Sequence, residues 1–380
     1  MNCSSSWGSS WTRFSSRTRS GSRRTSTCSQ DASSTSSASS NSTLAELDLS
    51  GNYVGALGAT ALAQGIKSNE GLTEIRVNGN ELGDDAFAAF VDALVEHKGN
   101  CMREVDVGNN GAGLKGAEAV GRLLLKETPQ DDADASAKVG GSLQKLNLYM
   151  NEMGDAGIST IAEALEKNTS LTWLDVGGNN IGPKGADHVS RMLSKNRTLA
   201  TLEFGYNPIG PEGMESIAEA VKFAKAADPG LGETGSKGVT ELHLGWCKGG
   251  PKGAASFADA LRFNETLTHL DLRGNNLADE GTVALAESLK VVNDCLKKLD
   301  LGYNEIKDDG AFALSRALKS NPEGSVTSLL LNNNYISKFG EVALQESADF
   351  VREMRSADEE DEVPSYDEEG GLSTEIEIVL

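Results

Sequence analysis

Four side chains in the second half of the sequence have the types and spacing that could bind a divalent metal ion. Glu241 and His243 are separated by one residue, and so are His269 and Asp271. Imidazole nitrogens and carboxylate oxygens are common zinc ligands. On neighbouring parallel strands about 4.8 Å apart, the two pairs could converge. Charged pairs on the solvent side of strands are common without metal, so we predict a charged surface and no metal site.

No catalytic signature accompanies these residues. The sequence lacks the G-x-x-x-x-G-K-[ST] loop, the G-x-S-x-G elbow, the H-E-x-x-H helix and the kinase signature motifs. We therefore predict that the protein is not an enzyme and binds no cofactor. The 42 glycines are interpreted as residues of turns and close packing.

The elements that position these side chains come from one phrase, L-x-x-L-x-L-x-x-N, which occurs ten times between Leu44 and Asn334. Its last positions are Asn52, Asn80, Asn110, Asn151, Asn179, Asn207, Cys247, Asn275, Asn304 and Asn334, at intervals of 28 to 41 residues. The L-x-L alternation predicts a short strand whose leucines point inward. Because the chain turns after each strand, we expect the closing asparagine to bond backbone groups of its own and the neighbouring turn.

A helix follows each phrase. Ile158, Ile161 and Leu165 recur at helical spacing after Gly157, and Val283, Leu285 and Leu289 do so after Gly281. A strand, a turn and a full helix repeating about every 28 residues resemble the ribonuclease-inhibitor class of leucine-rich repeat proteins. The resemblance covers residues 44 to about 355. It implies an α/β solenoid, a horseshoe of about ten strand-helix repeats with parallel strands on the concave face and helices on the convex face.

Three segments follow from composition. Residues 1–43 are rich in Ser and Arg and are predicted to be a disordered arm, with an organellar transit peptide as the alternative. Residues 44–355 are the repeat domain, closed by a capping helix between Glu341 and Arg355. Residues 356–380 hold ten acids and no Lys or Arg, which predicts a disordered acidic tail. No cap is evident before Leu44, so the arm, another chain or a missing upstream part would have to cover that end.

The charge balance restricts the partners. Of the total charge of −21, residues 1–43 carry +4 and residues 356–380 carry −10, which leaves −15 on the repeats. Nucleic acid needs clustered basic residues, so we do not expect it as a partner. No segment reaches the roughly 18 apolar residues of a membrane span. The five cysteines lack C-x-x-C spacing and read as free thiols, which favours a cytoplasmic protein.

Solvent-facing positions of the strands are mostly acidic and include several aromatic residues. These positions include ten acids and four bases. The acids are Glu46, Asp48, Glu74, Glu104, Asp106, Asp175, Glu203, Glu241, Asp271 and Asp300, and the bases are Arg76, Lys145, Arg273 and Lys298. Exposed aromatics on a charged surface are typical anchors of a protein interface. The predicted partner-binding residues are Tyr149, Trp173, Asp175, Glu203, Tyr206, His243, Trp246, Asp271, Arg273, Asp300 and Tyr303.

We therefore predict a non-enzymatic scaffold that binds a basic protein partner on its concave face. The resemblance also covers the Ran GTPase-activating protein and the repeat domains of NOD-like receptors, so a small-GTPase regulator and a fragment of a sensor are the alternatives. The GTPase activator's functional arginine lies in a loop among its early repeats. Here the turns after Asn52 and Asn80 contain no arginine. Two inserts, residues 127–141 and 224–238, interrupt the period and are a second possible binding region.

Overall fold

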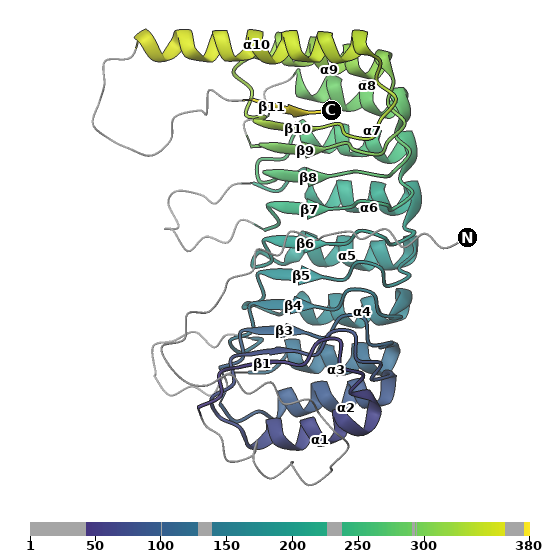
Figure 1. Cartoon of the computed structure of the whole chain (residues 1–380), viewed down its shortest axis with the longest axis vertical. Coiled ribbons are helices and arrows are strands. Elements are labelled where there is room, and N and C mark those ends of the chain that lie inside the picture. Colours follow the sequence, from purple (N-terminus) through teal and green to yellow (C-terminus); the bar gives the residue numbers. More distant parts are fainter. Residues whose placement is uncertain are drawn as a thin grey trace. The chain divides into compact units, whose positions relative to one another are not determined.

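One parallel sheet and one layer of helices form the repeat region. The structure, a computed structural model, describes residues 43–99, 101–127, 139–225, 238–290, 293, 295–361 and 376–380. Eleven strands lie side by side in sequence order, all parallel, and each helix packs against the next helix along the chain. Figure 1 shows the strands stacked in one layer with the helices on one side of it. The predicted α/β leucine-rich repeat solenoid is confirmed.

Every strand is three residues long. The strands are β1 (Glu46–Asp48), β2 (Glu74–Arg76), β3 (Glu104–Asp106), β4 (Lys145–Asn147), β5 (Trp173–Asp175), β6 (Thr201–Glu203), β7 (Glu241–His243), β8 (His269–Asp271), β9 (Lys298–Asp300), β10 (Ser328–Leu330) and β11 (Glu377–Val379). The helices are α1 (Gly55–Ser68), α2 (Asp84–Val95), α3 (Leu114–Leu124), α4 (Gly154–Leu165), α5 (Pro183–Lys195), α6 (Gly210–Lys222), α7 (Gly250–Leu261), α8 (Ala278–Leu289), α9 (Asp308–Ser320) and α10 (Lys338–Asp361).

The leucine pattern builds a single continuous core between the two layers. In strand β7, for example, Leu242 is fully buried between the partly exposed Glu241 and His243, and Leu244 after the strand is also buried. Small helical residues let neighbouring helices approach closely. A Cβ added at Gly281 in α8 would lie 2.9 Å from the Cβ of Ala254 in α7, which leaves no room for a side chain. The repeat therefore fixes both the strand spacing and the helix spacing.

The closing asparagines form the predicted ladder. The side-chain amide of Asn275 donates to the carbonyls of Leu244 (2.8 Å) and Leu272 (3.0 Å). Its oxygen accepts the N–H groups of Cys247 and Gly249, both at 3.0 Å. From Asn80 onward, the closing asparagines thus satisfy backbone groups of their own turn and of the preceding one, which would otherwise be buried without partners. Cys247 replaces one asparagine, and its Sγ lies 3.6 Å from the carbonyl oxygen of Phe204.

A second asparagine ladder, not predicted from the sequence, lies where the helices lead into the strands. The Asn196 amide donates to the Leu165 carbonyl (2.7 Å), and its oxygen accepts the N–H groups of Thr198 and Leu199. Asn168, Asn264 and Asn293 make equivalent bonds. Each stands three residues before the first leucine of its phrase, a regularity visible in the sequence.

The C-terminal end differs from the prediction of a tail beginning at residue 356. Helix α10 continues to Asp361, and strand β11 pairs with β10 in parallel. Ile376 is buried, and its carbonyl accepts a hydrogen bond from the Arg352 guanidinium (3.2 Å). The apolar residues Ile376 and Ile378 explain the difference, because they continue the buried strand pattern after the acidic stretch.

Several predicted features fall mostly outside the described residues. They are the arm of residues 1–43 up to residue 42, the inserts at residues 128–138 and 226–237, and residues 362–375 of the acidic segment. At the foot of the first insert, Glu127 and Val139 form an isolated antiparallel bridge. Within the described part of the chain, Cys101 and Cys247 are free thiols. In the same part, no helix combines the length and the apolar character needed to cross a membrane.

Candidate protein-binding face

The first and third residues of each strand form a surface that we call the strand face. Because side chains alternate along a strand, these residues point away from the core that the middle residue enters. Register aligns the third residues in one row, in which Asp175 neighbours Glu203, Glu203 neighbours His243, and His243 neighbours Asp271. Asp300 follows Asp271. The structure therefore brings these predicted site residues together on adjacent strands.

Several aspartates in this row also have a structural task. Asp175 accepts the N–H of Gly177 (2.8 Å), and Asp271 accepts that of Arg273 (2.9 Å). Asp300 makes the same bond with Gly302 (2.9 Å). These bonds to the second residue beyond hold the turn after each strand. The sequence predicts these acids as binding residues. The structure shows that they also serve the turn, which requires a side-chain acceptor at this position.

A cationic group neutralises one end of the row. Arg273 Nε lies 2.9 Å from Asp271 Oδ2. The His243 ring lies between two carboxylates, with Nε2 at 3.6 Å from Glu203 Oε1 and Nδ1 at 3.8 Å from Asp271 Oδ2. Burial alone would lower the pKa of His243, but the interaction with Asp271 and the charge of Glu203 outweigh it and raise that pKa.

Asp175 and Glu203 are adjacent carboxyl groups in this row without a lysine or arginine partner. Burial, and then the neighbouring charge of Glu203, raise the pKa of Asp175 to about 7, although the Gly177 N–H bond opposes this. Burial also raises the pKa of Glu203. Among the described residues, no lysine or arginine forms an ion pair with either group. His243 offsets part of this cost at Glu203, whereas Asp175 is held against both its desolvation and the charge of Glu203.

Aromatic side chains form a row beside the acids. The rings of Tyr149 and Tyr206 meet edge to face at 6.4 Å between centroids, and those of Tyr206 and Trp246 are stacked at 6.2 Å. The ring centroids of Trp246 and Tyr303 lie 5.5 Å apart, with an angle of 48° between the ring planes. Tyr206 remains 50% exposed and Trp246 36% exposed, so a partner can reach both. We call these four residues the aromatic row.

Three of these residues occupy a backbone conformation that L side chains rarely adopt. Tyr206, Trp246 and Tyr303 have φ of 59°, 62° and 57°. They stand two residues after the last core residue of the strand, where other repeats have Gly51, Gly79, Asn109, Gly178, Gly274 or Asn333, all with positive φ. A bulky residue there costs about 1–2 kcal/mol relative to glycine. Turn formation alone therefore does not account for the aromatic residues.

Met150 belongs with this row and was missed from the sequence. It occupies the same turn position as Tyr206, with φ of 55° and 48% exposure. A Cβ at Gly178 would lie 2.6 Å from Met150 Sδ, so the thioether lies across the glycine of the next repeat. Its place two residues after Leu148 would have identified it. Thioethers are adaptable contact groups, which suits a binding surface.

Trp173 takes a different place on the strand face. It is the first residue of β5 and aligns with Lys145 and Thr201 of the neighbouring strands. Trp173 is therefore in the row of first positions, five residues before the turn position that Tyr206, Trp246 and Tyr303 occupy in their repeats. The prediction grouped it with Tyr149, but the two rings come from different rows of the strand face.

The alternative metal arrangement does not form. Register places Glu241 beside His269 and His243 beside Asp271, as the alternative required. The four groups separate into two pairs, since His269 Nδ1 lies 3.9 Å from Glu241 Oε1 while His243 contacts Asp271. No group of three or more His, Cys, Asp or Glu side chains in the described ranges is arranged to bind a metal ion.

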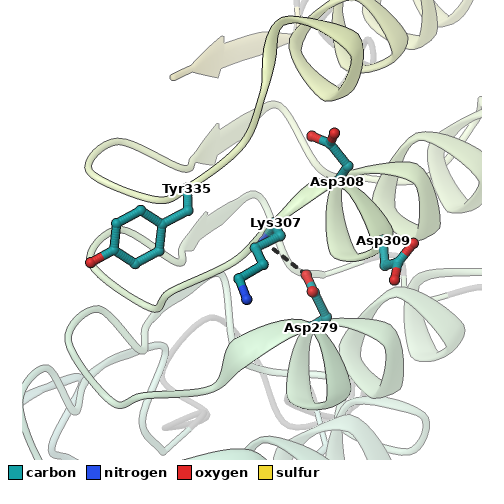
Figure 2. A pocket seen from close by; sticks show the side chains of 5 residues that line it. All are labelled: Asp279, Lys307, Asp308, Asp309 and Tyr335. Atoms are coloured by element: carbon teal, nitrogen blue, oxygen red, sulfur yellow. Dashed lines mark hydrogen bonds between the residues drawn. The ribbon is translucent and has the colours of Figure 1, made fainter.

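A shallow pocket on another side of the molecule is explained by helix capping. Asp279, Lys307, Asp308, Asp309 and Tyr335 line it (Figure 2). Asp279 accepts the backbone N–H groups of Lys307 (2.8 Å) and Gly310 (3.0 Å), at the start of α9. Asp308 accepts the N–H of Ser337 (2.8 Å). These carboxylates cap the helix of the following repeat, so the pocket needs no ligand to account for its residues.

Comparison with known proteins agrees with the repeat geometry. The Leucine Rich repeat family model matches residues 40–63, 142–162, 167–188, 195–218, 263–286 and 292–315. The sequence phrase, the asparagine ladder and these matches define a leucine-rich repeat protein.

Three solved structures with related folds have low sequence identity to this chain. The leucine-rich repeat-containing protein LegL7 from Legionella pneumophila is 15% identical, with 85% of this chain and 92% of that chain covered and a TM-score of 0.45. The internalin inlF from Listeria monocytogenes is 16% identical, with 74% and 81% covered and a TM-score of 0.36. The TLR13 chain of a TLR13–ssRNA13 complex is 17% identical, with a TM-score of 0.43; 80% of this chain matches 35% of that one.

Proposed function

We propose that this leucine-rich repeat protein is a non-enzymatic scaffold whose strand face, the predicted concave face, binds a basic protein partner. The observation that carries the proposal is the aromatic row beside the row of acids. Aromatic anchors next to charged groups are the usual composition of a protein interface with strong anchor residues.

The cost of the aromatic row supports this function. Tyr206, Trp246 and Tyr303 adopt the left-handed region although glycine or asparagine fills the same turn in other repeats. Residues kept in strained conformations concentrate at functional sites. The row also leaves apolar ring surface exposed, which a partner would bury.

Charge supports a basic partner. The third-position row holds Asp175, Glu203, Asp271 and Asp300, against the bases His243 and Arg273. Such a surface attracts positive protein surfaces and repels phosphate backbones. Protein is therefore the favoured partner, and nucleic acid is disfavoured.

We also infer that the repeats are of the ribonuclease-inhibitor type. Intervals near 28 residues and a full helix of 11 to 14 residues after each of the first nine strands support this subtype. Cytoplasmic location, expected from the free thiols, remains a prediction.

Partner capture tests the proposal. The full chain would be cross-linked in extract of its native cells, and the affinity of the purified partner would be compared across variants. Trp246→Ala and Tyr206→Ala should each cost about 2 kcal/mol or more, mostly through faster dissociation. Tyr335→Ala is the matched control, because Tyr335 is 69% exposed but lies at the capping pocket.

A charge series complements the aromatic variants. Asp271→Asn and Asp300→Asn keep an acceptor for the turn bond and remove the charge, so they should slow association and weaken its salt dependence. Unchanged affinity in both Trp246→Ala and Tyr206→Ala would refute strand-face binding. The inserts at residues 127–141 and 224–238 would then become the candidates.

A further inference from the structure

Adjacent carboxylates elsewhere on the strand face are neutralised by the chain itself. Glu74 and Glu104 are register partners, and Arg76 binds both, with its Nη2 at 2.9 Å from Glu74 Oε2 and 2.6 Å from Glu104 Oε1. Farther along the sheet, after strand β8, Arg273 binds Asp271. In both places an arginine supplies the positive charge, since its planar group can contact two acceptors at once.

The register partners Asp175 and Glu203 are the exception. Among the described residues no arginine or lysine pairs with them, and His243 reaches only Glu203, at 3.6 Å. The raised pKa of Asp175 reflects the same lack of compensation, because burial and the charge of Glu203 both disfavour its ionised form. An external cation would remove this cost.

Aromatic rings border the pair. Gly177 has no side chain, and the point where its Cβ would stand lies 3.1 Å from both Tyr149 Cδ2 and Asp175 Oδ1. The Tyr149 ring edge and the Asp175 carboxylate therefore both lie against Gly177, close to each other. Tyr206 continues this edge, edge to face with Tyr149. Guanidinium groups favour this combination, because they donate to carboxylates in their plane and stack on rings with their faces.

We propose that Tyr149, Asp175, Glu203 and Tyr206 form a subsite for an arginine side chain on a basic segment of the partner. The proposal rests on the proposed function, in which the strand face binds protein, and it names the chemistry that this part of the face recognises. A divalent cation is a poorer fit, because it requires more oxygen ligands than two carboxylates supply.

Direct binding to defined peptides tests the subsite on the full chain. The probe is a dye-labelled Gly/Ser peptide that carries two arginines, compared with its lysine and its neutral citrulline versions by fluorescence anisotropy at pH 8 and low salt. The arginine peptide should bind about fivefold more tightly than the lysine peptide, and the citrulline peptide should not bind. Equal binding of the arginine and lysine peptides, or no binding of the arginine peptide, overturns the proposal.

Two variants and one matched control locate the site. Asp175→Asn and Glu203→Gln should each weaken binding about tenfold. Asn147 is the residue equivalent to Asp175 in the preceding repeat, and its side-chain oxygen accepts the N–H of Tyr149 (2.8 Å). An asparagine can therefore hold this turn, so the Asp175→Asn variant should fold. Asp48→Asn is the control, because Asp48 makes the same bond to Ser50 N but lies in the first repeat, beside Arg76. An equal loss in Asp48→Asn would mean diffuse attraction and would refute a subsite.

A pH series provides an independent measurement. Since the pKa of Asp175 is about 7, the arginine peptide should bind about tenfold less tightly at pH 6 than at pH 8. Asp175→Asn should remove most of that dependence and leave the smaller part due to Glu203 and His243, whose pKa values are also raised. If Asp175→Asn leaves the affinity for the arginine peptide unchanged while Trp246→Ala weakens binding of the native partner, the subsite is refuted and strand-face binding is retained. If the peptide shows the expected affinities while Trp246→Ala leaves the affinity for the native partner unchanged, strand-face binding of the partner is refuted instead.

Discussion

Trp246 lies across the backbone of Gly274, the residue at the same turn position in the next repeat. A Cβ at Gly274 would stand 2.6 Å from Cε2 of the indole, and the φ of Gly274 is +67°. The glycine thus leaves the space through which Trp246 reaches Tyr303, 5.5 Å away between ring centroids. The packing of the aromatic row therefore requires a glycine at position 274 as well as the rings themselves.

Gly274→Ala should displace the indole. We expect a loss of about 1 kcal/mol in the free energy of unfolding from the left-handed backbone and about 1 kcal/mol more from the clash. Gly111→Ala is the control, since Gly111 has the same φ of +67° with nothing within 4 Å of an added Cβ. Urea unfolding followed by tryptophan fluorescence measures both. Equal losses in the two variants would show that Trp246 does not rest on Gly274.

Asp175→Asn should stabilise the protein at high pH. The pKa of Asp175 is raised to about 7 in the folded state, above its usual value of 3.8, so the folded protein binds the extra proton. The stability due to that proton is full below the unfolded pKa and is lost as pH rises toward 7 and above. Asp175→Asn should therefore raise the unfolding free energy by about 1–2 kcal/mol at pH 8 and by less at pH 5.

The measurement for Asp175 is urea unfolding at the two pH values, with Asp48→Asn as the control at an exposed third position. A benefit of the same size at pH 5 and pH 8 would contradict the raised pKa.

Asn275→Ala should be strongly destabilising. It leaves the carbonyls of Leu244 and Leu272 and the N–H groups of Cys247 and Gly249 without the partner they have in the fold. We expect a loss of about 3 kcal/mol or more in the free energy of unfolding. Asn52→Ala in the exposed first turn should cost less than about 1 kcal/mol, by chemical denaturation of both variants. A small effect at Asn275 would show that water can replace the ladder.

The last strand should stabilise the C-terminal repeats. Ile376→Ala removes a buried side chain beside β10 and should cost about 2 kcal/mol, whereas Glu377→Ala at an exposed position should cost little. Hydrogen exchange at Leu331 N, which donates to the Val379 carbonyl at 2.7 Å, reports the local effect. Unchanged exchange in Ile376→Ala would mean that β11 does not hold this edge.

The GTPase alternative makes a separate prediction. Tyr53 and Glu81 occupy the turns after Asn52 and Asn80 with positive φ, and no arginine accompanies them there. We therefore expect no acceleration of GTP hydrolysis by Ran in a single-turnover assay. An acceleration above about tenfold, equivalent to about 1.4 kcal/mol of barrier, would restore that alternative.

The sequence by itself determined the repeats, the direction of the strands and the role of the closing asparagines. Local pattern suffices there, because the alternation of Leu242 between Glu241 and His243 already decides which side chains enter the core. The aromatic positions Tyr206, Trp246 and Tyr303 were also visible as equivalent places in the phrase.

Only the tertiary structure decided which charges remain without a partner. Asp175 and Asp271 hold the same place in their repeats, yet Arg273 neutralises one of them and neither lysine nor arginine pairs with the other. Ion pairing and desolvation depend on neighbours one or two strands away and on the side chains beside a carboxylate, as Tyr149 lies beside Asp175. Strand β11 likewise required the sheet, because three residues after an acidic stretch become a strand only when the edge of β10 is there to pair with them.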